Sequence, residues 1–326
     1  MSKITDIRTY LMGIAILWVM ISHTKGIWVL PKFIECIQKT GYLGVDIFFF
    51  VSAYGLFYSM KKHLPMKQWY MRRFNRVLPK YWIVTIFTGM MIHWGLSDYI
   101  KEVTFVGFLC PWVNHEPLLW YIPAAVLFYI VFPMFYQYRR PLTMGFIPIA
   151  VIMYVLSALL LCITREHGLA PYLPEFFIPR IPVFLLGMIF AEYEEFIRQR
   201  MNVCTTALLV CVSFAAFVLL ELHAMYETKF LSFFNISSIL LVCSLPFILY
   251  LCSILYKYVR ILNPFVLYCG KYSLELYLLH YAFINIVIRS NIFVNINSNY
   301  TIIGAFVLSF PCAFLLNKVL TIKWIR

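Results

Sequence analysis

Apolar residues occur along this chain in long runs separated by polar segments. We count ten runs, at about 8–26, 42–60, 77–95, 118–137, 143–163, 180–196, 202–221, 236–255, 264–288 and 300–319. An α-helix needs about 20 mostly apolar residues to cross a bilayer. The pattern therefore predicts an all-α, polytopic membrane protein with about ten transmembrane helices.

Composition supports the same class, since 63% of the residues are hydrophobic, 13% are charged and the mean hydropathy is +0.82. No segment between the runs is long enough to fold as a soluble domain. Residues 1–326 are therefore predicted to form a single integral membrane domain in the plasma or inner membrane of the cell. The first run lacks an evident cleavage site, so it is predicted to be a retained helix and not a signal peptide.

The distribution of positive charge predicts the orientation. With ten spans both termini lie on one side, and 19 of the 27 Lys and Arg residues fall on that side against eight on the other. Cytoplasmic loops carry the excess of Lys and Arg, so both termini are predicted to be cytoplasmic. The net charge of +13 is thus an orientation signal, and no nucleic-acid partner is expected.

Ionisable residues inside the predicted spans are candidates for chemistry, because they are costly in lipid. His23 lies roughly 22 Å beyond Arg8 along the first span at 1.5 Å per residue. Asp46 falls near the outer end of the second span and His280 near the outer end of the ninth. A histidine oriented by a carboxylate is a common general base, so we favour a catalytic His23 and Asp46. The alternative is that His23 only locks helix packing.

A basic segment, Lys61–Lys80, lies on the opposite side of the membrane from His23. Arg72, Arg73 and Arg76 are expected at the N-terminus of the third span, where the helix dipole favours anions. Arg73 and Arg76 share a helix face and could bind a phosphate with both guanidinium groups, with help from Arg72 and Lys80. Binding of anionic lipid or a purely topological role is an equally open interpretation.

Five further residues are candidates for binding a second substrate. Trp120 and Tyr121 fall at the outer interface, where aromatic belts are common. Arg180 opens the sixth span, and Glu275 lies near His280 with Lys271 as its expected partner. The outward segments 96–117 and 164–179 are rich in acidic and aromatic residues, and could form a sugar-binding mouth or be simple connectors.

Several chemistries have no support in the sequence. The chain contains no Walker loop, HExxH motif, GxSxG elbow or kinase signature. Its nine cysteines show no metal-ligand spacing, so no metal is expected. Most are predicted to be packing residues, although Cys36 and Cys110 both fall in outward loops and could pair.

Six segments together resemble the acyltransferase 3 family of integral membrane O-acyltransferases. In family order they are GIAILWVMISHT (13–24), GYLGVDIFFFVSAYGL (41–56), RRFNRVLP (72–79), LLWYIPAAVLFYIVFP (118–133), RIPVFLLGM (180–188) and CGKYSLELYLLH (269–280). The resemblance implies a ten-span protein that transfers an acyl group, often acetyl, from cytoplasmic acyl-CoA to a hydroxyl of an extracytoplasmic glycan or glycolipid.

The resemblance also assigns residues. The family's first-helix histidine falls on His23, and its paired arginines fall on Arg73 and Arg76. The family tends to have a basic residue eleven positions before that histidine, where this chain has Met12, and Arg8 one turn earlier could replace it. The usual SGY motif reads SAY here, with Ala53 in place of glycine.

The sequence thus predicts a membrane acyltransferase that uses acyl-CoA as donor substrate and has no permanently bound cofactor. Its expected partners are acyl-CoA, the glycan or glycolipid acceptor and membrane lipid. A non-catalytic transporter or carrier of a glycolipid or an anionic metabolite is the alternative from another class. A structural partner in an envelope-glycan complex is a third.

Overall fold

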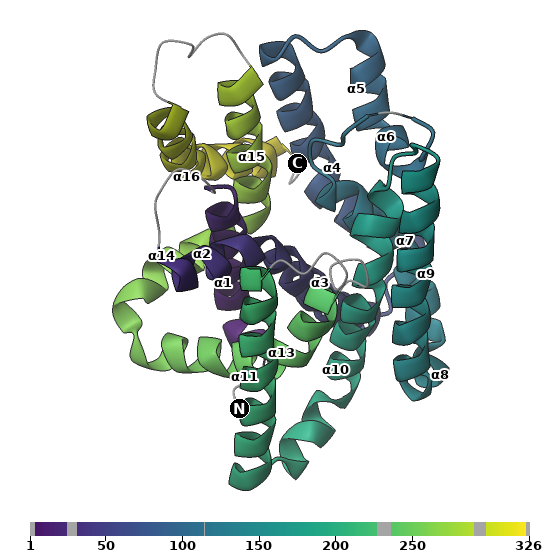
Figure 1. Ribbon diagram of the computed structural model, residues 1–326, viewed down its shortest axis with the longest axis vertical. Helices are drawn as coiled ribbons and strands as arrows, with labels where there is room; N and C mark the ends of the chain where they lie inside the picture. The colour runs from purple at the N-terminus through teal and green to yellow at the C-terminus, as the bar shows by residue number, and fades with distance from the viewer. Residues whose placement is uncertain (1–3, 25–30, 114, 227–235, 290–297, 324–326) are drawn as a thin grey trace. The chain divides into compact units, whose positions relative to one another are not determined.

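A computed structural model describes residues 4–24, 31–113, 115–226, 236–289 and 298–323, and every regular element in these ranges is a helix (Figure 1). The long helices are α1 (Ile4–Ser22), α3 (Gly44–Met60), α4 (Met66–Met91), α7 (Tyr121–Gln137), α9 (Phe146–Glu166), α10 (Ile181–Arg200), α11 (Val203–Tyr226), α13 (Ile236–Tyr258), α15 (Ser273–Arg289) and α16 (Ser298–Lys323). The short ones are α2 (Lys32–Thr40), η1 (Gly41–Leu43), α5 (Leu96–Val103), α6 (Val106–Leu109), α8 (Arg139–Met144), η2 (Leu173–Phe177), η3 (Ile178–Arg180), η4 (Arg260–Leu262) and α14 (Asn263–Lys271).

Each of the ten predicted apolar runs coincides with helical structure, with two changes in extent. The third helix begins at Met66, well before the predicted run, and the ninth run is broken at Tyr272 into α14 and α15. Six helices of the described chain are long and apolar enough to cross a membrane: Ile34–Met60, Phe146–Glu166, Leu173–Arg200, Val203–Tyr226, Ile236–Tyr258 and Tyr300–Leu320.

The chain divides into two compact units, each built from segments that are distant in sequence. Unit 1 comprises Met1–His63, Phe132–Leu159 and Ile178–Lys271. Unit 2 comprises Leu64–Val131, Leu160–Phe177 and Tyr272–Arg326. Each of the two units is described by itself below.

In unit 1, α1 packs antiparallel against α14 at two glycines. A Cβ atom placed on Gly13 would lie 2.0 Å from the carbonyl oxygen of Val266, and one on Gly270 would lie 1.8 Å from that of Thr9. Both separations are far shorter than a van der Waals contact, so the two backbones can approach this closely only where no side chain intervenes.

Helices α3 and α10 of unit 1 run parallel to each other. Three pairs of facing residues follow one another in the same direction along both helices: Asp46 and Arg180, Phe50 and Gly187, Tyr54 and Glu194. The N-termini of both helices therefore lie at the same end of the pair. Polar groups close each end, and between them the Phe50 carbonyl lies against Gly187.

In unit 2, α15 packs between α4 and α16 (Figure 1). Glu275 of α15 contacts Lys80 of α4 and Asn317 of α16, and the His280 ring stacks on Phe306 of α16. The short helices α5 and α6 follow α4 and pack against each other. They lead into the segment that precedes α7.

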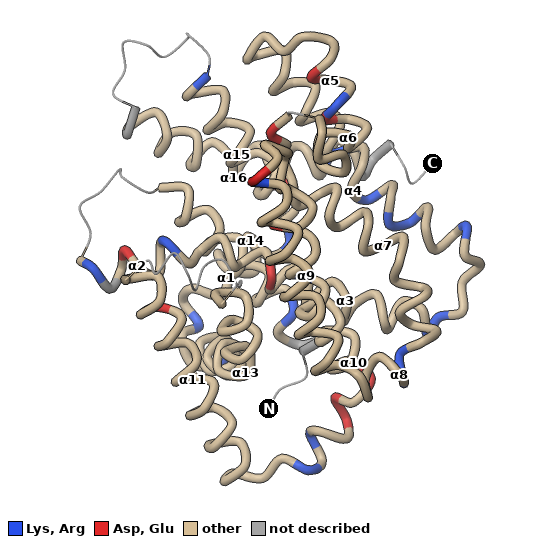
Figure 2. Tube along the Cα trace, turned by 45° about the vertical axis from the view of Figure 1, so that its right-hand side comes forward, with Lys and Arg blue, Asp and Glu red and all other residues tan. Residues whose placement is uncertain are grey.

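The surface and interior helices differ as expected for a protein in lipid. In the most apolar stretch of Ile34–Met60, 78% of the residues are buried inside the protein, whereas in the corresponding stretches of Phe146–Glu166 and Val203–Tyr226 the share is 17%. Apolar faces left uncovered on this scale are expected to contact lipid. Figure 2 marks the charged residues, most of which lie at helix ends, in connecting segments or in the first half of α4.

Candidate active site

His23 lies immediately after the last residue of α1. Its backbone N–H donates to the carbonyl of Met20 at 3.1 Å, which closes the turn that ends the helix. The side chain is half-buried. The next residue, Thr24, accepts a hydrogen bond from the side chain of Gln38 in α2 at 2.7 Å. The predicted base therefore sits at a helix end beside α2, and not within the helix as the apolar run suggested.

Asp46 and Arg180 form a fully buried ion pair. The Arg180 Nε atom lies 3.5 Å from Asp46 Oδ1, and the two side chains are 5% and 1% exposed. Asp46 belongs to the first turn of α3 and Arg180 immediately precedes α10. The pair joins the N-terminal ends of the two parallel helices. Arg180, predicted as a substrate-binding residue, is thus placed beside the predicted catalytic carboxylate.

The packing of α1 on α3 offsets Asp46 from His23 along the helix axes. A Cβ atom on Gly41 would lie 2.3 Å from the Trp18 carbonyl oxygen, and one on Gly44 would lie 2.5 Å from that of Ala15. Gly44 is level with Ala15, eight residues before His23, and Asp46 lies two residues farther away, so Asp46 is offset from His23 by about 15 Å along the helix axes at 1.5 Å per residue. The observed partner of Asp46 is Arg180, and its orientation of His23 stays a prediction.

The Arg8 side chain lies against Gly55 of α3, in the space that a side chain at position 55 would occupy. Its Nη2 atom would lie 2.9 Å from a Cβ atom placed on Gly55. The guanidinium group therefore packs across the backbone of α3 near the end distant from Asp46. Met12, where the family pattern has a basic residue, is half-buried one turn farther along α1.

One buried carboxylate and two tyrosine hydroxyls join α3 and α10 toward their other end. The hydroxyl groups of Tyr54 and Tyr58 donate to Glu194 Oε2 at 2.7 and 3.2 Å. Glu194 is 8% exposed. This cluster was not anticipated from the sequence, in which Glu194 lies in the polar end of an amphipathic segment.

The three arginines of the basic segment lie in the second and third turns of α4. Arg72 and Arg76 are exposed, whereas Arg73 is half-buried with its guanidinium carbon 5.5 Å from the centroid of the Trp69 ring. Because α4 begins at Met66, the arginines lie beyond its first turn. The expected placement at a helix N-terminus is therefore wrong, and the helix dipole contributes little here.

Lys80 pairs with Glu275, and Asn317 donates to the same carboxylate oxygen at 2.5 Å. The side chains of Lys80 and Glu275 are 12% and 2% exposed. The expected partner of Glu275 was Lys271, which the structure leaves exposed at the end of α14. A buried lysine held by a carboxylate is poorly placed to bind phosphate, so Lys80 is better described as the partner of Glu275.

His280 is buried in α15 and donates its Nδ1–H to the carbonyl of Leu276 at 2.7 Å. Its ring stacks on Phe306 with an interplanar angle of 17° and lies 5.9 Å from the ring of Tyr277. These contacts orient the ring within unit 2.

Trp120 and Tyr121 lie at the start of α7 and contact different aromatic groups. The Trp120 ring stacks on Phe176 with centroids 4.6 Å apart, and Phe176 stacks in turn on Tyr172. Tyr121 packs edge-on against Tyr277 at 5.0 Å. Burial raises the pKa of the Tyr172 hydroxyl, and the nearby carboxylates of Glu116 and Glu175 raise it further.

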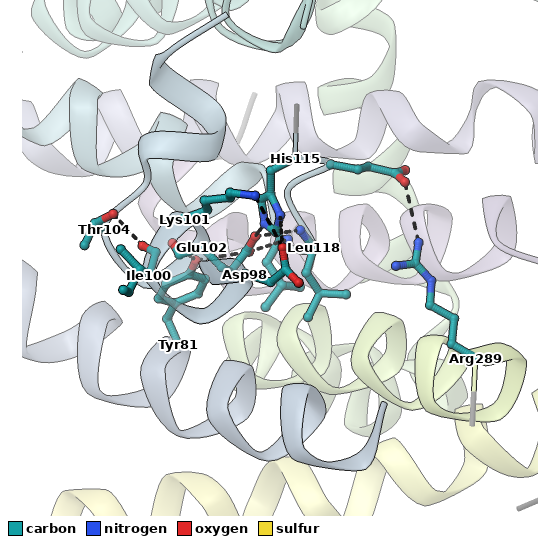
Figure 3. Close-up of polar contacts among 11 residues, drawn as sticks. Tyr81, Asp98, Ile100, Lys101, Glu102, Thr104, His115, Leu118 and Arg289 are labelled. Atoms are coloured by element: carbon teal, nitrogen blue, oxygen red, sulfur yellow. Dashed lines mark hydrogen bonds and ion pairs between the residues drawn. The ribbon is translucent and has the colours of Figure 1, made fainter. Parts of the chain in front are cut away.

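Glu102 is the centre of a polar cluster in unit 2 (Figure 3). Its carboxylate accepts hydrogen bonds from four groups: Tyr81 O–H at 3.1 Å, His115 Nε2 at 2.9 Å, and the N–H groups of Leu118 at 3.1 Å and Leu119 at 3.4 Å. The Tyr81 hydroxyl also lies 2.9 Å from the Glu102 carbonyl oxygen. Glu102 is 3% exposed. The sequence marked it only as one of several acidic loop residues.

Cysteines and metal-ligating groups complete the inventory of reactive side chains. All nine cysteines are free thiols, Cys36 and Cys110 included. Among the described residues no group of three or more His, Cys, Asp or Glu side chains is arranged to hold a metal ion.

Comparison with known proteins places these residues in a family. The family model described as an acyltransferase domain, acyltransferase 3, matches residues 9–318 and therefore includes parts of both units. No curated protein or solved structure shows a significant match. Because the matched range covers nearly the whole chain, this multi-pass membrane protein belongs to the acyltransferase 3 family.

Proposed function

We propose that this protein is a membrane O-acyltransferase that moves an acyl group from cytoplasmic acyl-CoA to a hydroxyl of an extracytoplasmic glycan or glycolipid. The observation that carries the proposal is the family match over residues 9–318, which includes His23 and the arginines of α4. Acetyl is the acyl group that we would test first, and the plasma or inner membrane is the proposed location.

The arginines of α4 are proposed to bind the phosphates of the donor. Arg72 and Arg76 are exposed and four residues apart, so their side chains lie on one face of the helix. Arg73 is held against Trp69, which restricts its side chain before a donor arrives. A guanidinium fork binds phosphate oxygens through two parallel hydrogen bonds. Lys80 is left out of this set because Glu275 engages it.

His23 is proposed to be the general base. It would take the proton of the acceptor hydroxyl while the hydroxyl oxygen attacks the thioester carbonyl carbon. The new bond joins the acceptor oxygen to the acyl carbon, and the bond between that carbon and sulfur breaks. The leaving thiolate of coenzyme A then takes a proton, so no external oxidant or reductant is needed. Transfer through a transient acyl-enzyme would balance equally well.

Ten spans with both termini in the cytoplasm are the proposed topology. Six helices meet the length and hydropathy expected of a span, and Ile7–Ser22 and Tyr121–Gln137 are apolar but shorter. The remaining two are α4, whose first half carries the arginines, and the broken pair α14 and α15. The charges in the first half of α4 lower its mean hydropathy, and the break at Tyr272 divides the ninth run into two helices that are each too short to cross a bilayer alone.

The proposal is tested by measuring base-labile O-acetate on the surface glycans of the host. A deletion strain is complemented with the wild-type chain or with an equally expressed His23→Ala variant. We expect acetate with the wild type and at least a hundredfold less with His23→Ala, since a general base contributes about 10²–10⁴ in rate. The matched control is His93→Ala, which changes a histidine after the end of α4 that has no proposed role.

Equal acetate with wild type and His23→Ala would remove His23 from catalysis. If complementation with the wild type also releases no free coenzyme A from acyl-CoA, the carrier interpretation replaces the enzyme.

A further inference from the structure

We propose that Glu102 is a positioning residue that fixes Trp120 as part of an aromatic wall for a sugar ring of the acceptor. The inference rests on the proposed function, because it gives Trp120, a substrate-binding candidate from the sequence, a role in binding the proposed acceptor. The argument uses the Glu102 cluster, which consists of Tyr81, Asp98, Glu102, His115 and the N–H groups of Leu118 and Leu119, all within unit 2.

The contacts of Glu102 converge on the segment just before Trp120. Oε2 accepts from the N–H of Leu118 at 3.1 Å and Oε1 lies 3.4 Å from the nitrogen of Leu119. These are the two residues that precede Trp120 in the chain. They lie before α7 begins at Tyr121, so no helix of their own supplies the acceptors for their N–H groups. Glu102 supplies them and thereby sets the path of the backbone into α7.

The carboxylate is itself held from two other segments. The Tyr81 hydroxyl in α4 reaches Oε1, and His115 in the following loop reaches Oε2 (Figure 3). Asp98 lies on the far side of the imidazole, with its Oδ1 3.7 Å from Nδ1. Both ring nitrogens of His115 thus face carboxylates and its side chain is 7% exposed, which argues against a catalytic base and for a fixed support.

The aromatic stack that begins at Trp120 is suited to a sugar ring of the acceptor. Trp120 continues into a stack with Phe176 and Tyr172, whose successive interplanar angles are 19° and 14°. All three rings are half-buried. The outer face of such a stack offers a flat apolar surface on which the C–H face of a pyranose can pack. The exposed carboxylate of Glu116 and that of Glu175 lie within electrostatic reach of Tyr172, and carboxylates accept hydrogen bonds from sugar hydroxyls.

The energetic case follows from burial. A buried N–H group that loses its acceptor pays its full desolvation penalty, and Glu102 serves two of them along with a tyrosine hydroxyl and an imidazole. Replacing Glu102 by glutamine retains one acceptor oxygen and substitutes an NH₂ group for the other. One of the N–H groups is then left without an acceptor, so the segment 117–121 becomes more mobile while the rest of the unit keeps its packing.

The first test measures this directly by amide hydrogen exchange with mass spectrometry on the full-length protein in detergent. In Glu102→Gln we expect exchange of a peptide covering 117–121 to accelerate at least tenfold. Tyr81→Phe, which removes one donor to the carboxylate and no backbone acceptor, should show a smaller acceleration. The matched control is Glu194→Gln, a buried acid that also accepts tyrosine hydroxyls but lies in unit 1. It should leave that peptide unchanged. Unchanged exchange in Glu102→Gln would overturn the proposal.

The second test separates acceptor binding from general loss of fold. With acetyl-CoA as donor and purified host surface polysaccharide as acceptor, Glu102→Gln should raise the KM for the polysaccharide about tenfold while kcat and the KM for acetyl-CoA change less than twofold. A proportional fall in all activity, or an unchanged acceptor KM, would overturn the proposal. If the wild type acetylates no polysaccharide, the acyltransfer proposal fails on its own, and the exchange experiment still decides whether Glu102 fixes the segment.

Discussion

At the scale of single residues, the buried pair of Asp46 and Arg180 is the contact whose stability depends most on the charges of its two side chains. Two charges that are 1% and 5% exposed have lost most of their hydration, and each depends on the other for compensation. Removing one partner of such a pair is expected to cost more than removing both, because the remaining charge is left uncompensated.

We predict that Asp46→Asn and Arg180→Gln each lower the free energy of unfolding by about 3 kcal/mol or more. The double variant should recover at least about 1 kcal/mol of the summed loss, which thermal unfolding in detergent would show as a partly restored Tm. The control pair is Glu195 and Arg198, an exposed i,i+3 pair at 2.8 Å, whose neutralisation should change Tm little. Additive effects at Asp46 and Arg180 would contradict the ion-pair description.

The proposed donor binding is also tested at single side chains. Arg76→Ala removes an exposed guanidinium and should raise the KM for acyl-CoA about 10–100-fold, since hydrogen bonds to charged groups contribute about 1.5–3 kcal/mol. Arg73→Ala should act in the same direction and also loosen the contact with Trp69. Arg198→Ala is the control, and its donor KM should equal that of the wild type.

A donor that lacks the 3′-phosphate identifies which phosphate the arginines bind. If Arg76 binds that group, the modified donor should be used equally well by the wild type and by Arg76→Ala. Donor KM values that do not respond to either arginine would remove the arginines from the binding site.

Sequence reasoning can propose site residues from local motifs, but it does not give their partners in the fold. His23, Arg73 and Arg76 are proposed from such motifs, and their roles stay predictions. The partner of Glu275 was expected to be Lys271, four residues away, whereas tertiary packing brings in Lys80, 195 positions away. Glu102 could be noted as an acidic loop residue, but its contacts with Tyr81 and His115 depend on how the loop folds, and no periodicity encodes that.

At the scale of helices, the apolar runs predicted location well and continuity poorly. The runs are long and apolar enough to favour helices in lipid, and each run coincides with helical structure. Hydropathy does not report helix breaks, so the interruption at Tyr272 was not seen. The short helix α2 was also missed, because its nine residues lie within a segment that hydropathy marks only as polar.

The close contact of α1 with α14 gives a test at this scale. We expect Gly13→Ala and Gly270→Ala each to lower Tm clearly, because the added Cβ would lie 2.0 and 1.8 Å from backbone carbonyl oxygens that cannot rotate away. Gly304→Ala in α16 is the matched control, since nothing lies within 4 Å of its Cβ position. Alanine there should be neutral or stabilise the helix by up to about 1 kcal/mol. Equal effects at the three positions would show that α1 and α14 are not in this close contact.

At the scale of the whole molecule, the proposed number and direction of the spans can be tested by labelling cysteines. Two native cysteines provide a matched pair of probes in a variant that retains one cysteine at a time. Cys204 is exposed at the start of α11 on the predicted cytoplasmic side, and Cys110 is half-exposed after α6 on the predicted outer side.

We predict that a membrane-impermeant maleimide labels the Cys110 variant in intact cells and the Cys204 variant only after the cells are permeabilised. Labelling of Cys204 in intact cells, with Cys110 protected until permeabilisation, would reverse the proposed orientation. Labelling of both residues from the same side would mean that an even number of spans lies between them, and not the proposed three.

The parallel pairing of α3 with α10 has a consequence for biogenesis. Asp46 emerges from the ribosome 134 residues before Arg180, which at roughly 5–20 residues per second is about 7 to 27 s of synthesis. Throughout that interval the nascent chain carries a carboxylate whose native partner does not yet exist, at a cost of about 2.5–3.5 kcal/mol if it is held at the centre of the bilayer. The second transmembrane segment is therefore expected to remain with the insertion machinery, or near the membrane surface, until the arrival of Arg180 allows it to settle.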